Sequence, residues 1–306
     1  MNSKSVALIA AFLVAIIYGI NYTIAKEVMP TYIKPYGFIL LRVLGAAILF
    51  WLLSLFTTKQ KIDKSDFGRI ILAALFGVCI NMLAFFKGLS LTSPINASVI
   101  MVNTPILVLI LSAIILKEKI TFIKVLGILI GLAGAILLIV YGKSTIQGDH
   151  PLIGNSLIFV NATSYGLYLI IVKKLTQKYN AITLIKWLYL FGLLMVIPFG
   201  ISELQEVSWQ EIPDGIYFNI SYVIIFTTFF AYLLNLFALT RLRPTTLSAF
   251  IYLQPLLASS YALLLKKDSL NSLKVIAAIL IFSGVYLVTK SNNPKKASEL
   301  GSESAD

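Results

Sequence analysis

Residues 96–139 read NASVIMVNTPILVLILSAIILKEKITFIKVLGILIGLAGAILLI. Two nearly uninterrupted apolar runs flank the short charged stretch KEK at 117–119. With their continuations, at 94–116 and 121–141, each run has the roughly 20 residues that a helix needs to cross about 30 Å of hydrocarbon. Strands of a membrane barrel need only about ten residues, and their side chains alternate between apolar and polar. The stretch therefore predicts two membrane-spanning helices joined by a tight turn.

The rest of the chain has the same character. Of its 306 residues, 58% are hydrophobic and 12% are charged, with a mean hydropathy of +0.91. A soluble domain has about 25% charged residues, so this composition indicates that lipid surrounds much of the surface. We predict an all-α membrane protein with ten transmembrane helices, at 5–25, 35–57, 68–88, 94–116, 121–141, 151–173, 181–201, 215–238, 244–265 and 270–290. The polar residues 291–306 are expected to form a disordered cytoplasmic tail.

An internal repeat organises these helices. An offset of 150 residues aligns Pro94 with Pro244, Pro105 with Pro255, Lys117 with Lys267 and Gly134 with Gly284. We therefore divide the chain into two five-helix repeats, residues 1–141 and 151–290, followed by the tail at 291–306. Because five is odd, the second repeat begins on the opposite side of the membrane, and such inverted repeats typically hold a transport site at their interface. A duplication that only builds a helix bundle is the alternative.

Two stretches resemble the EamA family of the drug/metabolite transporter (DMT) superfamily. One is the segment 96–139 quoted above, with its small residues, mid-helix proline, lysine–glutamate turn and glycine-rich helix, and the other is YGINYTIAK at 18–26. The resemblance extends from about Val6 to Lys290 and implies ten helices, cytoplasmic termini and export of metabolites or drugs. The second repeat departs from the family pattern, with Asp268, Ala277 and Ile281 at the positions of Glu118, Gly127 and Gly131.

Lysine and arginine residues indicate the orientation, because they gather in the cytoplasmic connections of membrane proteins. With the N-terminus inside, we assign 17 of them to the inside and 6 to the outside, counting Lys266, Lys267 and Lys274 as inside and Arg241 and Arg243 as outside. This predicts a multi-pass protein of a bacterial plasma (inner) membrane with both termini cytoplasmic. The net charge of +12 then indicates contact with anionic headgroups of the lipid bilayer and not with nucleic acid.

Polar and aromatic side chains lie deep within the predicted helices, where lipid contact would be costly. We predict that they line a cavity for a zwitterion or an uncharged polar molecule, with helices one, three, four, six, eight and nine around it. These candidate substrate-binding residues are Tyr18, Asn21, Tyr22, Asn81, Asn103, Thr104, Asn161, Tyr165, Tyr168, Asn235, Tyr252 and Gln254. Tyr232 accompanies them. Hydrogen bonding between helices is the alternative role for any single one of these residues.

Two prolines and two basic residues complete the candidate site. Pro105 and Pro255 lie in the middle of their predicted helices, so we expect either a hinge at the cavity or a benign kink. Arg42 and Lys186 lie at similar depths of the second and seventh helices. Each either extends to the headgroups or attracts an anionic substrate from an outer vestibule.

Acidic, histidine and cysteine side chains contribute little to the candidate site. We expect Glu118 and Asp268 to pair with Lys117 and Lys267 in cytoplasmic turns, which leaves Glu27 at the outer end of the first helix as a candidate coupling residue. One histidine and one cysteine make a metal site or a Cys–His nucleophile improbable. The chain also lacks a GxxxxGK[ST] loop for ATP. We therefore expect no cofactor, no metal and no catalytic residue.

These observations predict a transporter and not an enzyme. The expected activity is export of small metabolites, such as amino acids or similar polar or zwitterionic compounds, by alternating access. A multidrug exporter is the alternative within transport. An integral membrane enzyme that modifies lipids is the alternative of another class, disfavoured by the missing catalytic residues. The substrate, the coupling ion and the choice between monomer and dimer are left open by the sequence.

Overall fold

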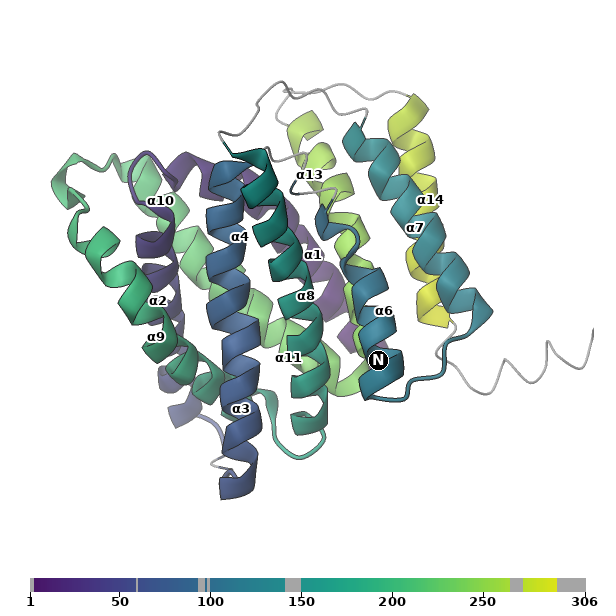
Figure 1. Ribbon diagram of the computed structural model, residues 1–306, viewed down its shortest axis with the longest axis horizontal. Helices are drawn as coiled ribbons and strands as arrows, with labels where there is room; N and C mark the ends of the chain where they lie inside the picture. Colours follow the sequence, from purple (N-terminus) through teal and green to yellow (C-terminus); the bar gives the residue numbers. More distant parts are fainter. Residues whose placement is uncertain are drawn as a thin grey trace, which may run out of the picture.

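The computed structural model describes residues 3–58, 60–92, 97, 100–140, 150–264 and 272–290, and their regular elements are all helical (Figure 1). The α-helices are α1 (Ser3–Val28), α2 (Pro35–Leu55), α3 (Phe67–Ala74), α4 (Ile80–Leu91), α6 (Thr104–Ile115), α7 (Phe122–Val140), α8 (Pro151–Leu175), α9 (Ala181–Gln205), α10 (Asp214–Tyr222), α11 (Ala231–Arg241), α12 (Pro244–Ala249), α13 (Leu253–Leu264) and α14 (Ser272–Lys290). The π-helical segments are η2 (Leu75–Cys79) and η4 (Val223–Phe230), and the 3-10 segments are η1 (Lys64–Asp66), η3 (Trp209–Glu211) and η5 (Phe250–Tyr252). The predicted tail at 291–306 lies outside the described residues.

Length and apolar composition allow seven helices of the described residues to cross a membrane. They are Ser3–Asn21, Pro35–Leu55, Lys64–Leu91, Leu152–Leu175, Ala181–Gln205, Asp214–Arg241 and Ser272–Lys290. Large apolar side chains are exposed at the surface of the bundle. Phe56, directly after the Pro35–Leu55 helix, is 86% exposed, and Ile114 of α6 is 69% exposed. Such faces suit lipid. The predicted all-α membrane class is thus confirmed, and the described parts of the other predicted helices form α6, α7 and α12–α13.

Glycines allow α7 and α14 to pack closely along one side of the bundle (Figure 1). A Cβ atom added to Gly284 would lie 2.5 Å from the backbone nitrogen of Gly131, and one on Gly127 would lie 2.9 Å from the carbonyl oxygen of Gly284. Gly134 faces α14 in the same way. Small residues at this spacing let helix backbones approach. These glycines of α7 therefore pack within the chain.

The α2 and α9 helices pack side by side and antiparallel on the other side of the bundle (Figure 1). Gly37, near the start of α2, lies against Glu203 near the end of α9. At the opposite end of the pair, the ring of Trp51 lies 5.5 Å from that of Trp187. These two contacts fix which residues of α2 and α9 lie at the same height along the helix pair.

The connections between helices gather at two ends of the bundle. At one end, three hydrogen bonds join every second connection along the chain. Lys178 donates to Asp66 at 2.8 Å, Lys173 donates to the carbonyl of Leu242 at 2.9 Å, and Thr245 donates to Glu118 at 2.8 Å. At the other end, Lys34 pairs with Glu206, and Thr92 donates to Asn155 at 2.6 Å. The chain therefore runs back and forth between the two ends.

This arrangement corrects one part of the predicted topology. Arg243 lies 3.8 Å from Glu118, so the connection that carries Arg241 and Arg243 is at the same end as the turn at Glu118. Assigning these two arginines to the side opposite Glu118 was wrong, because the chain passes between the two ends four times, in α7, α8, α9 and α10–α11, between the two connections. The predicted side of Lys266 and Lys267, and the expected pairing of Asp268 with Lys267, fall on residues 265–271, which lie outside the described part of the chain.

Candidate functional site

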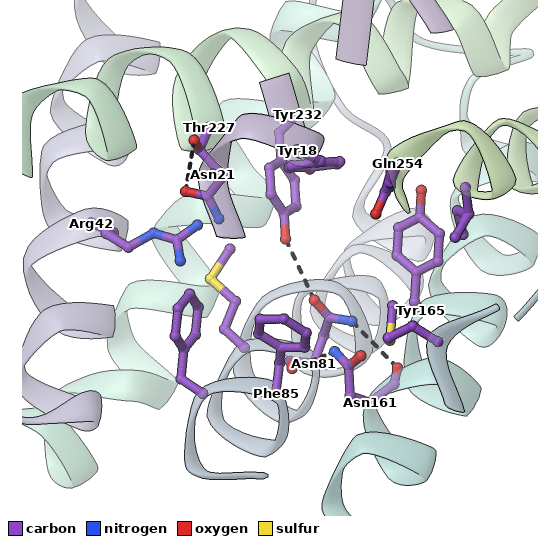
Figure 2. A pocket seen from close by; sticks show the side chains of 14 residues that line it. Tyr18, Asn21, Arg42, Asn81, Phe85, Asn161, Tyr165, Thr227, Tyr232 and Gln254 are labelled. Atoms are coloured by element: carbon purple, nitrogen blue, oxygen red, sulfur yellow. Dashed lines mark hydrogen bonds between the residues drawn. The ribbon is translucent and has the colours of Figure 1, made fainter. Parts of the chain in front are cut away.

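A cavity of ≈ 110 Å³ lies among α1, α2, α4, α8, α11, α13 and η4 (Figure 2). Seven predicted site residues line it: Tyr18, Asn21, Arg42, Asn81, Asn161, Tyr165 and Gln254. The lining also includes Tyr232 and six residues that the sequence did not single out, Met82, Phe85, Phe86, Met101, Thr227 and Ile251. Mostly apolar walls with a few fixed polar groups are typical of small-molecule sites.

A reciprocal pair of asparagines joins α4 to α8 at the cavity. The side-chain nitrogen of Asn161 donates to the carbonyl of Asn81 at 2.7 Å, and that of Asn81 donates to the carbonyl of Asn161 at 3.4 Å. The hydroxyl of Tyr232 donates to Oδ1 of Asn81 at 3.5 Å (Figure 2). These bonds set the orientation of both amides. They leave Oδ1 of Asn161 buried and without a hydrogen-bond partner among the described residues.

The π-helical segment η4 aims two threonines at opposite neighbours. Thr227 donates to Oδ1 of Asn21 at 3.0 Å, which ties η4 to α1. Thr228 donates to the carbonyl of Val223 at 2.7 Å and accepts from Nε of Arg42 at 3.1 Å. A π-segment shifts the backbone hydrogen bonds by one residue, and such segments are frequent at functional sites. Here the shift brings adjacent side chains to two different helices.

The other π-helical segment, η2, receives side chains of α8 in a similar way. Ser164 donates to the carbonyl of Phe76 at 2.7 Å, so a hydroxyl satisfies a backbone oxygen within the π-segment. A Cβ atom on Gly77 would lie 2.3 Å from the ring of Tyr168. Only glycine leaves room for that ring. Tyr168 therefore packs between α8 and η2 and does not line the cavity, contrary to its predicted role.

Among the described residues that line the cavity, Arg42 alone is basic. It is 3% exposed, and its guanidinium carbon lies 4.6 Å above the ring of Phe86. Nη1 has no hydrogen-bond partner among the described residues. Figure 2 shows the guanidinium pointing into the pocket beside Asn21. Neither predicted position, at the headgroups or in an outer vestibule, fits a side chain this deeply buried.

Lys186 does not share this environment. Its Nζ lies 5.0 Å from the ring centre of Trp51, at the far end of α2. In the antiparallel register of α2 and α9, Lys186 and Arg42 are about ten positions apart, or about 15 Å along the helix axis. The prediction that both flank one vestibule was therefore wrong. Two residues that lie equally far from the starts of two antiparallel helices lie at opposite ends of the helix pair.

The helix breaks fall before the prolines and not at them. Pro105 is the second residue of α6, and Pro255 lies in the first turn of α13, after the 3-10 segment η5. Proline is tolerated there because the first turn of a helix has no intrahelical partners for its N–H groups. Met101 and Ile251 precede the two breaks at the 150-residue offset, and both line the cavity. The expected kink within a continuous helix is thus replaced by a helix start.

Several predicted residues lie outside the cavity lining. Asn103 and Thr104 donate to the carbonyls of Ile100 at 3.4 Å and Met101 at 2.6 Å, within the break before α6. Tyr252 is buried against Gly131 of α7. Asn235 is buried on α11. The side chain of Tyr22 lies outside the described residues.

Two of the missed lining residues match a polar or aromatic residue that the sequence did single out. At the 150-residue offset, Met82 matches Tyr232 and Phe85 matches Asn235, so the repeat could have identified both. Met101 and Ile251 match only each other, and neither was a candidate. Thr227 depends on a π-segment that apolar periodicity does not reveal. Across the described part of the chain, no group of three or more His, Cys, Asp or Glu residues could hold a metal ion.

Comparison with known proteins agrees with this architecture. An uncharacterized transporter of Archaeoglobus fulgidus is 26% identical over 94% of this chain and 98% of its own length. The uncharacterized transporter YyaM of Bacillus subtilis is 26% identical over 92% of this chain and 95% of its own length. A protein of known crystal structure superposes with a TM-score of 0.77 at 16% identity, over 95% of this chain and 99% of that one. The model of the EamA-like transporter family matches residues 5–140 and 152–290, and the chain is a member of that family of membrane transporters.

Proposed function

We propose that this protein exports small polar or zwitterionic metabolites, such as amino acids, by alternating access through the cavity. The observation that carries the proposal is the convergence of Asn21, Asn81, Asn161 and Gln254 on one cavity. Hydrogen bonding between helices accounts for the Asn81–Asn161 pair. It does not account for Oδ1 of Asn161, which is buried and unpartnered in the described part of the chain. A bound polar molecule would supply the missing partner.

The proposed mechanism needs ten transmembrane helices in two inverted five-helix repeats. Support comes from contacts that recur in pairs: α1 packs on α11 and α13, and α8, its counterpart in the second repeat, packs on α4 and α6. The helices Lys64–Leu91 and Asp214–Arg241 begin and end 150 residues apart, and each contains a π-segment. Two near-equivalent halves offer two near-equivalent conformations, each open to one side.

We place the protein in a bacterial plasma membrane with both termini cytoplasmic. With Arg241 and Arg243 counted on the side of the N-terminus, and Lys266, Lys267 and Lys274 on the other side, the first side carries 16 of the 25 Lys and Arg residues and the second carries 7. The remaining two, Arg42 and Lys186, lie within helices. The excess still follows the rule that basic connections are cytoplasmic.

Multidrug export is the second candidate function, because Met82, Phe85, Phe86 and Ile251 make part of the cavity wall apolar. Adaptable methionine and aromatic walls suit varied apolar ligands. A lipid-modifying enzyme has less support, since the described residues that line the cavity include no Asp, Glu, His or Cys to act on a substrate.

The test is efflux from proteoliposomes that contain the purified full chain. Vesicles are loaded with the twenty common L-amino acids, neutral sugars and a cationic dye, and each released compound is quantified against protein-free vesicles. Gln254→Leu, in the cavity, should reduce efflux at least tenfold, whereas the matched Gln205→Leu, on the exposed end of α9, should not. Selective dye efflux would favour multidrug export, and no efflux of any compound in either direction would refute the proposal.

A further inference from the structure

The lining of the cavity leaves one cationic donor without a partner of opposite charge. Nε of Arg42 is occupied by the neutral hydroxyl of Thr228 at 3.1 Å, and the face of the guanidinium by the ring of Phe86. Nη1, on the same buried group, has no hydrogen-bond partner among the described residues. A guanidinium stays protonated, so its charge must be balanced or tolerated where it lies.

No carboxylate of the described residues balances this charge. None of the ion pairs found among them includes Arg42, and the lining of the cavity holds no Asp or Glu. A buried, unpaired cation is strongly unfavourable. The phenyl ring and the threonine lessen that cost, but a carboxylate would remove it.

Nearby groups make the pocket a better match for a carboxylate than for a halide ion. Oδ1 of Asn21 accepts from Thr227, which leaves the Nδ2 hydrogens of Asn21 facing the cavity beside the guanidinium (Figure 2). A planar guanidinium and an amide N–H supply several donors to two oxygens. Tyr165 and Gln254 line the opposite side in this view, where the remainder of a ligand would lie.

We infer that Arg42 is the residue that selects the substrate class: it binds a carboxylate of the transported molecule, while Oδ1 of Asn161 accepts a hydrogen bond from a donor on the same molecule. An α-amino acid carries both groups. The inference rests on the proposed transport function and narrows it to carboxylate-bearing substrates.

The first test compares acids with their amides in the wild-type protein. Proteoliposomes are loaded with the twenty L-amino acids in one experiment and with the corresponding L-amino acid amides in another. We expect each exported amino acid to leave at least about tenfold faster than its amide, because the amide lacks the charge that Arg42 would bind. Equal rates for acids and amides would overturn the inference while leaving transport itself intact. Absence of efflux for acids, amides and neutral sugars would instead refute the proposed function.

Variants then assign the preference to Arg42. Arg42→Gln should remove the tenfold preference for acids, and Arg42→Lys, which keeps the charge but loses the planar donors, should keep part of it. Lys186→Gln removes a cation of α9 that does not line the cavity, and it should leave the ratio unchanged. A preference that persists in Arg42→Gln would overturn the inference. If that variant does not fold, the wild-type comparison and Arg42→Lys still decide.

Discussion

The hydroxyl of Thr245 donates a 2.8 Å hydrogen bond to Oε1 of Glu118, and the same oxygen accepts a hydrogen bond from Nζ of Lys124. The side chain of Lys124 is fully buried, and that of Glu118 is 9% exposed. Thr245 belongs to the first turn of α12, whereas Glu118 and Lys124 flank the turn between α6 and α7. The bond thus joins the two proposed repeats at the end of the bundle that we assign to the cytoplasm.

Replacing Glu118 should therefore destabilise the fold. Glu118→Gln leaves the Lys124 ammonium buried without its counter-ion, and breaking a buried pair in this way costs about 3–5 kcal/mol. Thr245→Val removes a hydrogen bond to a charged acceptor and should cost about 1.5–3 kcal/mol. The measurement is the unfolding free energy of purified protein in detergent.

Lys117→Gln is the control for this prediction. The sequence indicated Lys117 as the partner of Glu118, but Lys117 is exposed, and the ion pairs of Glu118 among the described residues are with Lys124 and Arg243. We expect a change below about 0.5 kcal/mol. A larger loss in Lys117→Gln than in Glu118→Gln would restore the pairing predicted from sequence.

Close packing of α7 on α14 gives a second prediction. A methyl group at Gly284 would lie 2.5 Å from a backbone nitrogen of α7, so Gly284→Ala should force the helices apart and cost about 1–3 kcal/mol. Gly68→Ala is the matched control, because a Cβ atom at Gly68 would have no neighbouring atom within 4 Å and alanine favours the helix. That variant should be neutral or slightly stabilised in the same unfolding assay. Equal losses in both would show that backbone freedom, and not helix contact, requires the glycine.

Composition, periodicity and the internal repeat predicted the helical class and placed six of the fourteen lining residues in the cavity, with Tyr232 beside them. They did so because a polar side chain in lipid is costly wherever it lies in the chain. Which face of a helix is turned inward was less accessible. Tyr165 and Tyr168 are three residues apart on α8, yet one lines the cavity and the other packs on Gly77. On α4 and α11, the preceding π-segments also rotate the helix and so change which residues face inward, and these segments have no apolar signature.

Ion-pair partners were also beyond the sequence. Glu118 is adjacent to Lys117, and proximity along the chain favoured Lys117 as its partner. The turn instead brings Lys124, six residues on, to the carboxylate. The sequence indicated how far along its helix Arg42 lies, but not which residues surround it. Its contacts with Phe86 and Thr228 depend on how α2 packs against later segments of the chain.

Alkaline pH should weaken a contact at the other end of the bundle. The hydrogen bond that Lys34 donates to Glu206 raises the pKa of the Lys34 ammonium above its usual value. Because the folded state holds this proton more tightly, the contribution is complete below the usual lysine pKa of about 10.4 and is lost as the pH rises through the raised pKa. Both side chains are exposed, so the effect is small and screened by salt.

The measurement is the melting temperature between about pH 9 and pH 12, at low and high salt, for wild type and Lys34→Gln. The variant should lose less stability than wild type across this interval at low salt, and the difference should shrink at high salt. Lys119→Gln, at an exposed lysine of the opposite end, serves as the control. An unchanged pH profile in Lys34→Gln would show that the pair contributes nothing.

The break before α6 provides the last prediction, which concerns transport. Two features hold the chain open there: Pro105 has no N–H to donate to the carbonyl of Met101, and the hydroxyl of Thr104 occupies that carbonyl at 2.6 Å. Removing one feature leaves the other. We therefore expect Pro105→Ala and Thr104→Val each to reduce amino acid efflux from proteoliposomes about twofold or threefold.

The double variant should lose far more than the product of the two single effects, about tenfold or more, since only then can a continuous helix form and rotate Met101 out of the cavity. Protein abundance in the membrane should stay near that of wild type, because helix formation is favourable in lipid. Pro198→Ala is the matched control, as Pro198 lies inside α9 on an exposed face away from the cavity lining, and it should leave efflux unchanged. Strictly multiplicative effects in the double variant would show that the break is held by the surrounding helices and not by these two residues.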